Sequence, residues 1–116
     1  MKIIKTLLRL SQPFFQNKIL RYKDISIDLV LYKVFRGAKP LSIGPTEFKI
    51  LHLFMMSPKT IYFRKYIIDY IWGATKEVEP RTIDVHINRL RTAIKLEKEV
   101  KPLIQTIRSG GYCLDL

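Results

Sequence analysis

Residues 81–95 read RTIDVHINRLRTAIK, and this stretch indicates the fold more clearly than any other part of the chain. Its branched apolar residues recur at helical spacing and, at about 100° per residue, fall within roughly 60° of one another on a helical wheel: Ile83, Ile87, Leu90 and Ile94. The opposite half of the wheel is basic and polar except for one valine, Val85. The pattern predicts a packed helix whose outer face either meets solvent or binds a partner.

Length and composition limit the class of protein. With 116 residues the chain is expected to form one domain with a single modest core, and an apolar fraction of 47% favours a folded chain over a disordered one. The single cysteine, Cys113, excludes an internal disulfide. Together with the absence of a signal-peptide pattern, it favours a cytoplasmic protein.

The charge balance is the strongest global signal. Lysines and arginines number 21 against 10 acidic residues, which gives a net charge of +11. Such an excess favours a polyanionic partner, with nucleic acid as the first candidate and an anionic membrane surface as the second. The positions of the basic residues in the fold must decide between these partners.

The chain before residue 44 is expected to form a small sheet. Residues 25–43, ISIDLVLYKVFRGAKPLSI, carry β-branched and aromatic residues in near alternation, interrupted by turn residues, which predicts three or four short antiparallel strands. Residues 14–24 are interpreted as a linker running into a strand, and residues 2–10 as a short amphipathic helix.

Three helices are predicted after this sheet. The first begins at Gly44-Pro45-Thr46-Glu47, where the proline suits the first helical position, and ends at Ser57-Pro58. The second covers about residues 63–72 and ends at Gly73, which is expected to be a left-handed cap. The third follows Pro80 and contains the stretch quoted above.

The C-terminal segment predicts a hairpin. LIQTIR and YCLDL read as two strands, and Ser109-Gly110-Gly111 supplies the turn between them. The order of small sheet, three helices and hairpin predicts an α+β fold: a winged helix-turn-helix with an N-terminal antiparallel sheet and a C-terminal β-hairpin wing. In that fold the last helix lies in the major groove of DNA.

The polar face of the third helix is suited to reading bases in that setting. Arginine can bond a guanine edge bidentately, and Asn88 suits adenine. Asp84 can accept a hydrogen bond from cytosine, and Val85 can pack on a thymine methyl group. A solvated basic face is the simpler interpretation of such a helix in isolation, but its position between a helix-turn-helix loop and a wing favours DNA.

Four stretches carry a resemblance to a known family: GPTEFKILHLFM, the pair Trp72-Gly73, RTIDVHINRLR and IQTIRSGGY. They resemble the effector domain of OmpR/PhoB-type response regulators over about residues 19–116. The resemblance implies a four-stranded N-terminal sheet, three helices, a C-terminal hairpin, and head-to-tail binding of tandem copies to direct repeats in double-stranded DNA. It also implies that the loop between the second and third helices touches the RNA polymerase sigma subunit, through Thr75, Lys76, Glu77 and Glu79.

The resemblance further implies roles for single residues. Phosphate contacts fall to Arg81, Thr82, His86 and Arg91, and base reading to Asp84, Val85 and Arg89. Arg108 becomes the wing arginine entering the minor groove, and the DNA backbone contacts are Trp72, Thr106 and Tyr112. Asn88 belongs to the same face but departs from the pattern, because a basic residue is expected there. The position of Ser109-Gly110-Gly111 also shifts the usual wing glycines.

The resemblance divides the chain at residue 18. Residues 1–18 are expected to be the remnant of a receiver domain's last helix with its linker, and residues 19–116 the winged-helix domain. No acidic phosphoacceptor pocket is expected within these residues, and the sequence leaves open whether the chain is free-standing or a fragment. We expect a monomer in solution that binds DNA as a head-to-tail tandem.

Other functions are less well supported by the sequence. It has no nucleophile–base pair, phosphate-binding loop or paired carboxylates, so neither an enzyme nor a cofactor is expected. Only His52, His86 and Cys113 are available as imidazole or thiolate ligands, so no metal site is expected. Two alternatives remain: a decoy or modulator that pairs with intact response regulators through residues 1–10, and a membrane-surface protein anchored by MKIIKTLLRL.

Overall fold

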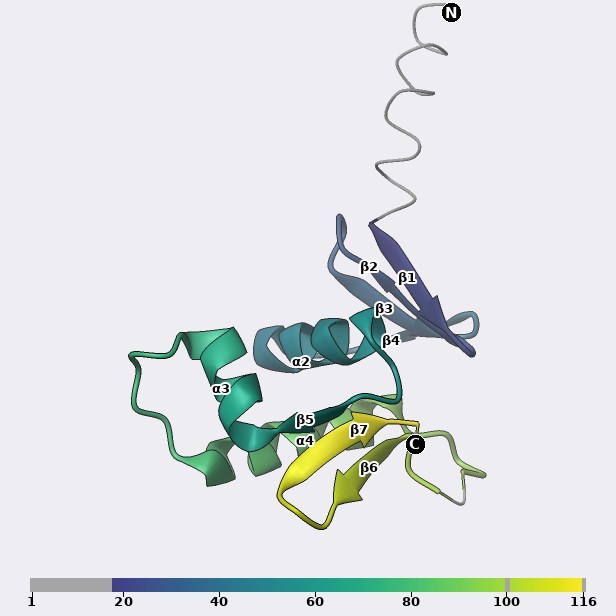
Figure 1. Ribbon diagram of the computed structural model, residues 1–116. Coiled ribbons are helices and arrows are strands. Elements are labelled where there is room, and N and C mark those ends of the chain that lie inside the picture. Colours follow the sequence, from purple (N-terminus) through teal and green to yellow (C-terminus); the bar gives the residue numbers. More distant parts are fainter. Residues whose placement is uncertain (1–17, 100, 116) are drawn as a thin grey trace, which may run out of the picture. The chain divides into compact units, whose positions relative to one another are not determined.

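The computed structural model describes residues 18–99 and 101–115 (Figure 1). The helix expected at residues 2–10 lies outside the described residues, as does the predicted receiver remnant except for Lys18. That division of the chain therefore stays a prediction. The contacts divide the chain into two compact units, Met1–Pro40 and Leu41–Leu116, and each is described by itself.

The first unit is built of short strands. β1 (Ile19–Tyr22) pairs antiparallel with β2 (Ile25–Asp28), and β2 pairs antiparallel with β3 (Lys33–Arg36). β4 (Lys39–Leu41) ends with the first residue of the second unit and completes the sheet order β1-β2-β3-β4. The expected four-stranded sheet is confirmed, and its first strand lies in the segment interpreted as a linker running into a strand.

The second unit contains the three predicted helices: α2 (Pro45–Met56), α3 (Arg64–Trp72) and α4 (Pro80–Ile94). Pro45 and Pro80 stand at the starts of their helices, where a missing N–H leaves no hydrogen bond unmade. α2 carries the most buried residues of the three and packs against α3, α4 and the C-terminal sheet. α2 is therefore buried on more than one side.

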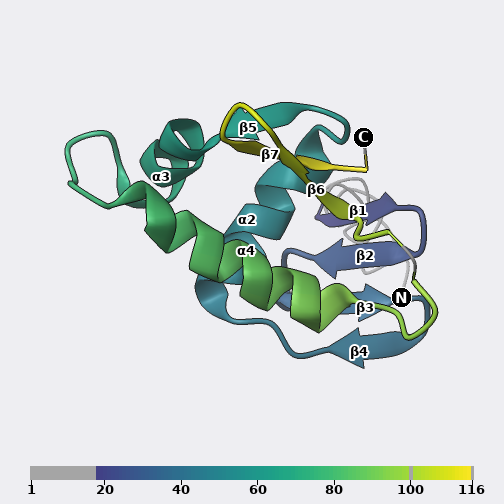
Figure 2. The ribbon, with the colours of Figure 1, turned by 90° about the horizontal axis from the view of Figure 1, so that it is seen from below.

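The apolar stripe of α4 lies in the core of this unit. Ile83, Ile87 and Leu90 are fully buried, and Ile94 is 2% exposed. Seen from below in Figure 2, α4 runs across α2 with the C-terminal strands beside it. Because the four side chains share one face, their burial fixes which residues of α4 point outward.

The end of α3 differs in one detail from the prediction. Gly73 has the expected positive φ of 92°, but its ψ of 151° is extended and not left-handed helical. Its N–H donates to the carbonyl oxygen of Asp69 at 2.9 Å, and the chain then leaves directly into an exposed loop. Only glycine readily adopts this combination of angles, so the residue type was right and the cap geometry wrong.

The C-terminal sheet has one strand more than the predicted hairpin. β6 (Ile104–Ile107) and β7 (Gly111–Leu114) form the hairpin, and β5 (Ile61–Phe63), which the sequence did not reveal, pairs antiparallel with the other side of β7. The strand order is β5-β7-β6. The α+β winged-helix class is confirmed, with its hairpin extended into a three-stranded sheet.

The hairpin turn also lies one residue earlier than predicted. Arg108–Gly110 form the turn, while Gly111 pairs with both Ile107 and Phe63 as the first residue of β7. A Cβ at Gly111 would lie 2.8 Å from the carbonyl oxygen of Tyr62 on β5. Gly111 therefore serves the close approach of two strands, whereas Gly110, at φ 101°, serves the turn.

We predict that Gly111→Ala lowers the free energy of unfolding by about 1–3 kcal/mol, because the added methyl group must displace the backbone of β5. Ser109→Ala, in the exposed turn, is the matched control and should change the stability by less than about 0.5 kcal/mol. Urea unfolding followed by circular dichroism measures both. Equal stability of the two variants would contradict the close approach of β5 and β7.

Candidate nucleic-acid interface

One side of α4 is open to solvent. Its exposed residues follow one another at helical spacing and form what we term the exposed stripe: Arg81, Val85, Asn88, Arg89 and Thr92. Val85 is 48% exposed although it is apolar. The buried stripe on the opposite side holds these residues outward, so α4 presents two positive charges, one amide and one apolar contact on a rigid helix.

The exposed stripe borders a shallow hollow. Ser42, which precedes α2, lines the hollow together with four α4 side chains of the exposed stripe and Ala93: Val85, Asn88, Arg89 and Thr92. Arg89 has no ion-pair partner among those identified within the described residues. Within the described part of the chain, Arg81 forms an ion pair with Glu79, with 3.7 Å between Nε and Oε2 and both side chains more than three-quarters exposed. Such a pair contributes almost nothing to stability, so Arg81 is available to another anion.

Asp84, expected to read a base, lies at the centre of a network of three elements. Its carboxylate accepts two hydrogen bonds from Arg64 of α3, from Nε at 3.0 Å and from Nη2 at 2.9 Å. The hydroxyl of Tyr112 on β7 donates a third to Oδ1. Sequence reasoning missed Arg64 entirely. Its position at the first turn of α3 carries no signal of a partner 20 residues further on.

This network shifts the pKa of both partners of the carboxylate. Burial, followed by the hydrogen bond to Asp84, raises the pKa of the Tyr112 phenol. The hydrogen bond to Asp84 and its negative charge raise the pKa of the Arg64 guanidinium. Both shifts favour the state in which Arg64 is charged, Tyr112 is neutral and the carboxylate is fully engaged.

Arg91, expected to contact phosphate, also binds the hairpin. Its Nε donates to the carbonyl oxygen of Ile104 at 3.0 Å, and its Nη2 donates to Thr106 Oγ1 at 2.6 Å. The guanidinium carbon lies 5.5 Å from the centre of the Tyr112 ring. Thr106 is exposed and Tyr112 is 5% exposed, so only one of these two predicted DNA contacts lies on the surface.

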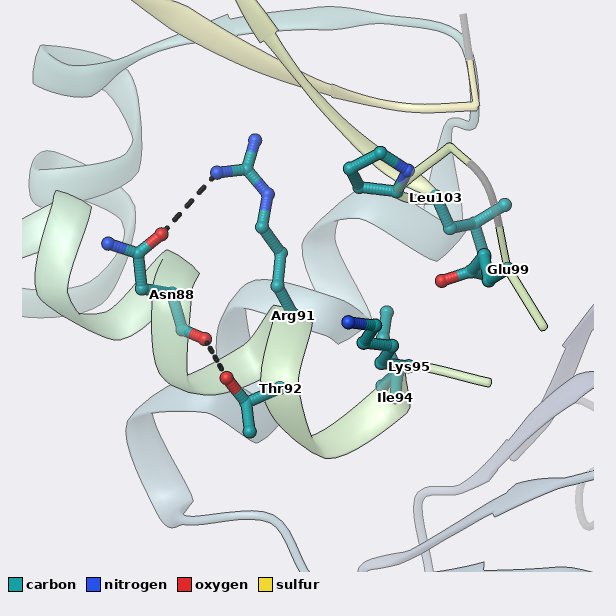
Figure 3. A pocket seen from close by; sticks show the side chains of 8 residues that line it. Asn88, Arg91, Thr92, Ile94, Lys95, Glu99 and Leu103 are labelled. Atoms are coloured by element: carbon teal, nitrogen blue, oxygen red, sulfur yellow. Dashed lines mark hydrogen bonds between the residues drawn. The ribbon is translucent and has the colours of Figure 1, made fainter. Parts of the chain in front are cut away.

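The same arginine lines a pocket of about 370 Å³ at the C-terminal end of α4 (Figure 3). Arg91 Nη1 lies 3.5 Å from Asn88 Oδ1, and Thr92 Oγ1 donates to the carbonyl oxygen of Asn88 at 2.9 Å. Leu103 and Ile94 form apolar parts of its wall. The pocket thus lies beside the contact between α4 and the hairpin.

His86 and Trp72, the other two predicted backbone contacts near the start of α4, are largely covered. His86 Nδ1 forms a hydrogen bond with Glu47 Oε2 of α2, and the two side chains are only 16% and 9% exposed. The Trp72 ring is half-buried, with its centre 6.1 Å from that of the His86 ring. Glu47 was noted in the sequence only for its place in the first turn of a helix, and its pairing with a residue of α4 was not foreseen.

The remaining predicted residues lie on the surface. Arg108 is exposed in the hairpin turn, and Thr82 is half-buried in the first turn of α4. The loop before α4 is exposed at all four residues predicted to touch a polymerase: Thr75, Lys76, Glu77 and Glu79. None of these assignments to a partner is tested by the geometry alone, and all of them stay predictions.

Other kinds of site find little support in the described part of the chain. Across residues 18–99 and 101–115, no three histidine, cysteine, aspartate or glutamate side chains gather closely enough to hold a metal ion. Among the helices of that same part, none combines the length and hydrophobicity needed to cross a membrane. Cys113 is fully buried on β7, as expected for a packing residue, and burial raises the pKa of its thiol.

Comparison with known sequences identifies relatives along most of the chain. Residues 38–114 match the family described as "Transcriptional regulatory protein, C terminal". The phosphate regulon transcriptional regulatory protein PhoB of Escherichia coli (strain K12) is 38% identical over 109 residues, which cover 94% of this chain and 47% of that protein. PhoB of Rhizobium meliloti (strain 1021) is 36% identical, with 97% of this chain and 49% of that protein covered. The chain thus spans about half the length of the curated relatives it matches.

Solved structures agree with the sequence matches. The Klebsiella pneumoniae RstA DNA-binding domain, solved in complex with the RstA box, superposes with a TM-score of 0.73 at 26% identity, covering 84% of this chain and 96% of that one. DrrB, a Thermotoga maritima OmpR/PhoB homolog, superposes with a TM-score of 0.74 at 25% identity, covering 94% of this chain and 50% of that one.

The raised pKa of Tyr112 makes a prediction about alkaline stability. Because the folded state favours the neutral phenol, its contribution is fully present below the unfolded pKa of about 10 and is lost as the pH rises through the folded pKa. Above pH 10 the wild-type protein should lose up to about 1.4 kcal/mol per pH unit more than Tyr112→Phe does. Urea unfolding of both proteins at pH 8 and pH 10.5 measures the difference, and equal losses would contradict a shielded phenol.

Proposed function

The chain belongs to the OmpR/PhoB family of transcriptional regulators, whose DNA-binding effector domain it contains, and we propose that it binds double-stranded DNA with a sequence preference. In this proposal α4 enters the major groove and the turn of the β6–β7 hairpin reaches the minor groove. The RstA domain of the same fold, solved with its DNA box, supports the choice of double-stranded DNA.

The observation that carries the proposal is the exposed stripe of α4. A helix that serves only the core needs no arginine, asparagine and valine side by side on its outer face. A helix in the major groove uses these residue types, because base edges offer hydrogen-bonding atoms and a thymine methyl group. The net charge of +11 supplies the long-range attraction to the phosphate backbone.

The exposed residues divide into two proposed roles. Val85 and Arg89 lie in the middle of the stripe and read bases, with Asn88 beside them. Arg81 and Thr82, in the first turn of α4, bind phosphate, since phosphate contacts set the orientation of a helix on the duplex. Trp72, His86, Arg91, Thr106 and Tyr112 remain predicted backbone contacts, through those atoms that their internal partners leave unoccupied.

Selection from random duplexes tests this function. The 116-residue chain is incubated with a library of random double-stranded DNA, and the bound fraction is amplified and sequenced over several rounds. An enriched motif supports sequence-specific binding. Binding without enrichment would leave only an electrostatic affinity for DNA, and no binding at moderate salt would remove the proposal altogether.

We predict that two arginines of the exposed stripe respond differently to alanine substitution. Arg89→Ala should weaken binding to the selected motif by about 1–3 kcal/mol and binding to random DNA much less, because a bidentate base contact is lost. Arg81→Ala should weaken both equally and flatten the slope of log K against log salt by about 0.9. Fluorescence anisotropy over a salt series measures both variants, and an equal loss for Arg89→Ala on both DNAs would make it a phosphate contact.

We further propose that copies bind in tandem. Head-to-tail binding to direct repeats requires one face of the domain to meet a different face of the next copy, so the contact is heterologous. The loop residues Thr75, Lys76, Glu77 and Glu79 then stay exposed for a contact with the RNA polymerase sigma subunit.

The tandem arrangement predicts a monomer in solution and cooperative binding only on DNA. On a duplex with two selected half-sites in direct repeat, the second copy should bind more tightly than a single copy binds to a duplex with one half-site. An inverted repeat should show no such gain. Light scattering and gel-shift titrations measure this. A stable dimer without DNA, or a greater gain on the inverted repeat, would rule out the head-to-tail arrangement.

A further inference from the structure

We propose that Asp84 and Arg91 are positioning residues that lock the β6–β7 hairpin onto α4, so that helix and hairpin turn bind DNA as one rigid body. The inference rests on the proposed function; it changes the part assigned to Asp84 and adds a second one to Arg91, which remains a predicted backbone contact. Asp84 was expected to read a base and Arg91 to bind phosphate. The contacts of their side chains within the protein support a different role.

Both residues lie on one edge of α4. They are seven positions apart, so at about 100° per residue their side chains leave the helix only about 20° from each other. This edge lies between the buried stripe and the exposed stripe. From it, the Asp84 carboxylate reaches the Tyr112 hydroxyl of β7 and the Arg91 guanidinium reaches Ile104 and Thr106 of β6. Asp84 therefore joins β7 to α4, and Arg91 joins β6 to α4.

The two ties converge on one cross-strand pair. Thr106 and Tyr112 are direct partners in the antiparallel register of β6 and β7. Arg91 donates to the hydroxyl of Thr106 and lies 5.5 Å from the ring centre of Tyr112, while Asp84 accepts from the hydroxyl of the same tyrosine. We term these four residues the hairpin clamp: Asp84, Arg91, Thr106 and Tyr112.

The clamp sits immediately below the turn. Only the Ile107–Gly111 pair separates the clamped pair from the turn residues Arg108–Gly110. At about 3.3 Å per residue, Arg108 begins roughly 7 Å along the strand from Thr106. Because the turn lies so close to the clamped pair, it has little freedom to move. The direction of the hairpin relative to α4 is therefore fixed before DNA binds.

The Asp84 carboxylate is already well supplied with donors. Arg64 and Tyr112 give it three hydrogen bonds, two of them from the charged guanidinium, and a carboxylate has about four acceptor positions. A cytosine could bond only the remaining position on Oδ2 or take the place of a present donor, and exchanging Tyr112 would leave its hydroxyl, in a residue 5% exposed, without its acceptor. The positioning role requires no such exchange.

The hairpin clamp predicts a result that would not be expected if each substitution only removed a DNA contact. If α4 and the hairpin turn bind as one body, the contribution of Arg108 depends on the clamp below it. Arg108→Ala should then weaken binding to the selected motif strongly in the wild-type protein and distinctly less in Tyr112→Phe. The expected coupling between the two substitutions is at least about threefold in the dissociation constant.

The test is a double-mutant cycle on DNA combined with a measurement without DNA. Dissociation constants are determined for wild type, Tyr112→Phe, Arg108→Ala and the double variant, on the selected motif. Amide hydrogen exchange of residues 104–114 is followed in the free proteins. Tyr112→Phe keeps the ring against Arg91 and removes only the hydroxyl, so the fold should persist, and circular dichroism checks this.

Tyr70→Phe is the matched control, because it removes a hydroxyl from a tyrosine that is 43% exposed on α3. We expect faster hydrogen exchange in the hairpin for Tyr112→Phe and not for Tyr70→Phe, together with the coupling to Arg108. Additive effects of Tyr112→Phe and Arg108→Ala, or unchanged exchange in the hairpin, would overturn the proposal.

Asp84→Asn separates positioning from base reading. If Asp84 is a positioning residue, selection with this variant should enrich the same motif, and the variant should bind that motif with lower affinity. The amides of its hairpin should also exchange faster. A changed base preference at one position, with normal exchange, would assign Asp84 to base reading instead. If the wild-type chain enriched no motif, the proposed function would fail, and the exchange measurement would still decide whether the clamp fixes the hairpin.

Discussion

The burial of one stripe of α4 is the constraint on which the rest of the second unit depends. Ile83, Ile87, Leu90 and Ile94 are all at most 2% exposed, and fully burying one such side chain stabilises the fold by about 1.5–3 kcal/mol. A domain of this kind is stable by only about 5–15 kcal/mol in total. Turning α4 by one residue would move Asp84 toward the core and expose an isoleucine, so the orientation of every other side chain on the helix follows from this stripe.

Polar contacts then decide what the correctly oriented helix can do, and their environments differ sharply. The exposed pair of Arg81 and Glu79, at 3.7 Å, is weak and leaves the guanidinium accessible. The Asp84 carboxylate joins α3, α4 and β7 through shorter bonds to Arg64 and Tyr112. The first pair therefore belongs to the solvent-exposed surface of α4, and the second joins α4 to two neighbouring elements of the fold.

The sequence predicted those features that depend on local pattern. The period of α4, the prolines that open α2 and α4, and the alternation of the N-terminal strands were sufficient for the α+β class. It did not reveal β5, because three residues carry too short a pattern and the strand exists through pairing with β7 about 50 residues away. The sequence also did not reveal that β7 begins at Gly111. Only the neighbouring β5 backbone requires a glycine at that position.

The same difference between local pattern and contacts distant in the sequence applies to the residues of the candidate site. A helical wheel separates buried from unburied positions, but it cannot tell a side chain that faces solvent from one that faces another element of the fold. Asp84 and Arg91 lie on the unburied side of the wheel, yet their partners are 28 and 15 residues away on the hairpin. Val85 and Arg89 remain exposed, so the exposed stripe holds fewer of the predicted base-reading residues than the sequence suggested. If α4 reads bases through this smaller set of residues, as proposed, the direction of the hairpin matters more, because a second contact in the neighbouring groove adds selectivity only when its distance from the first is constant.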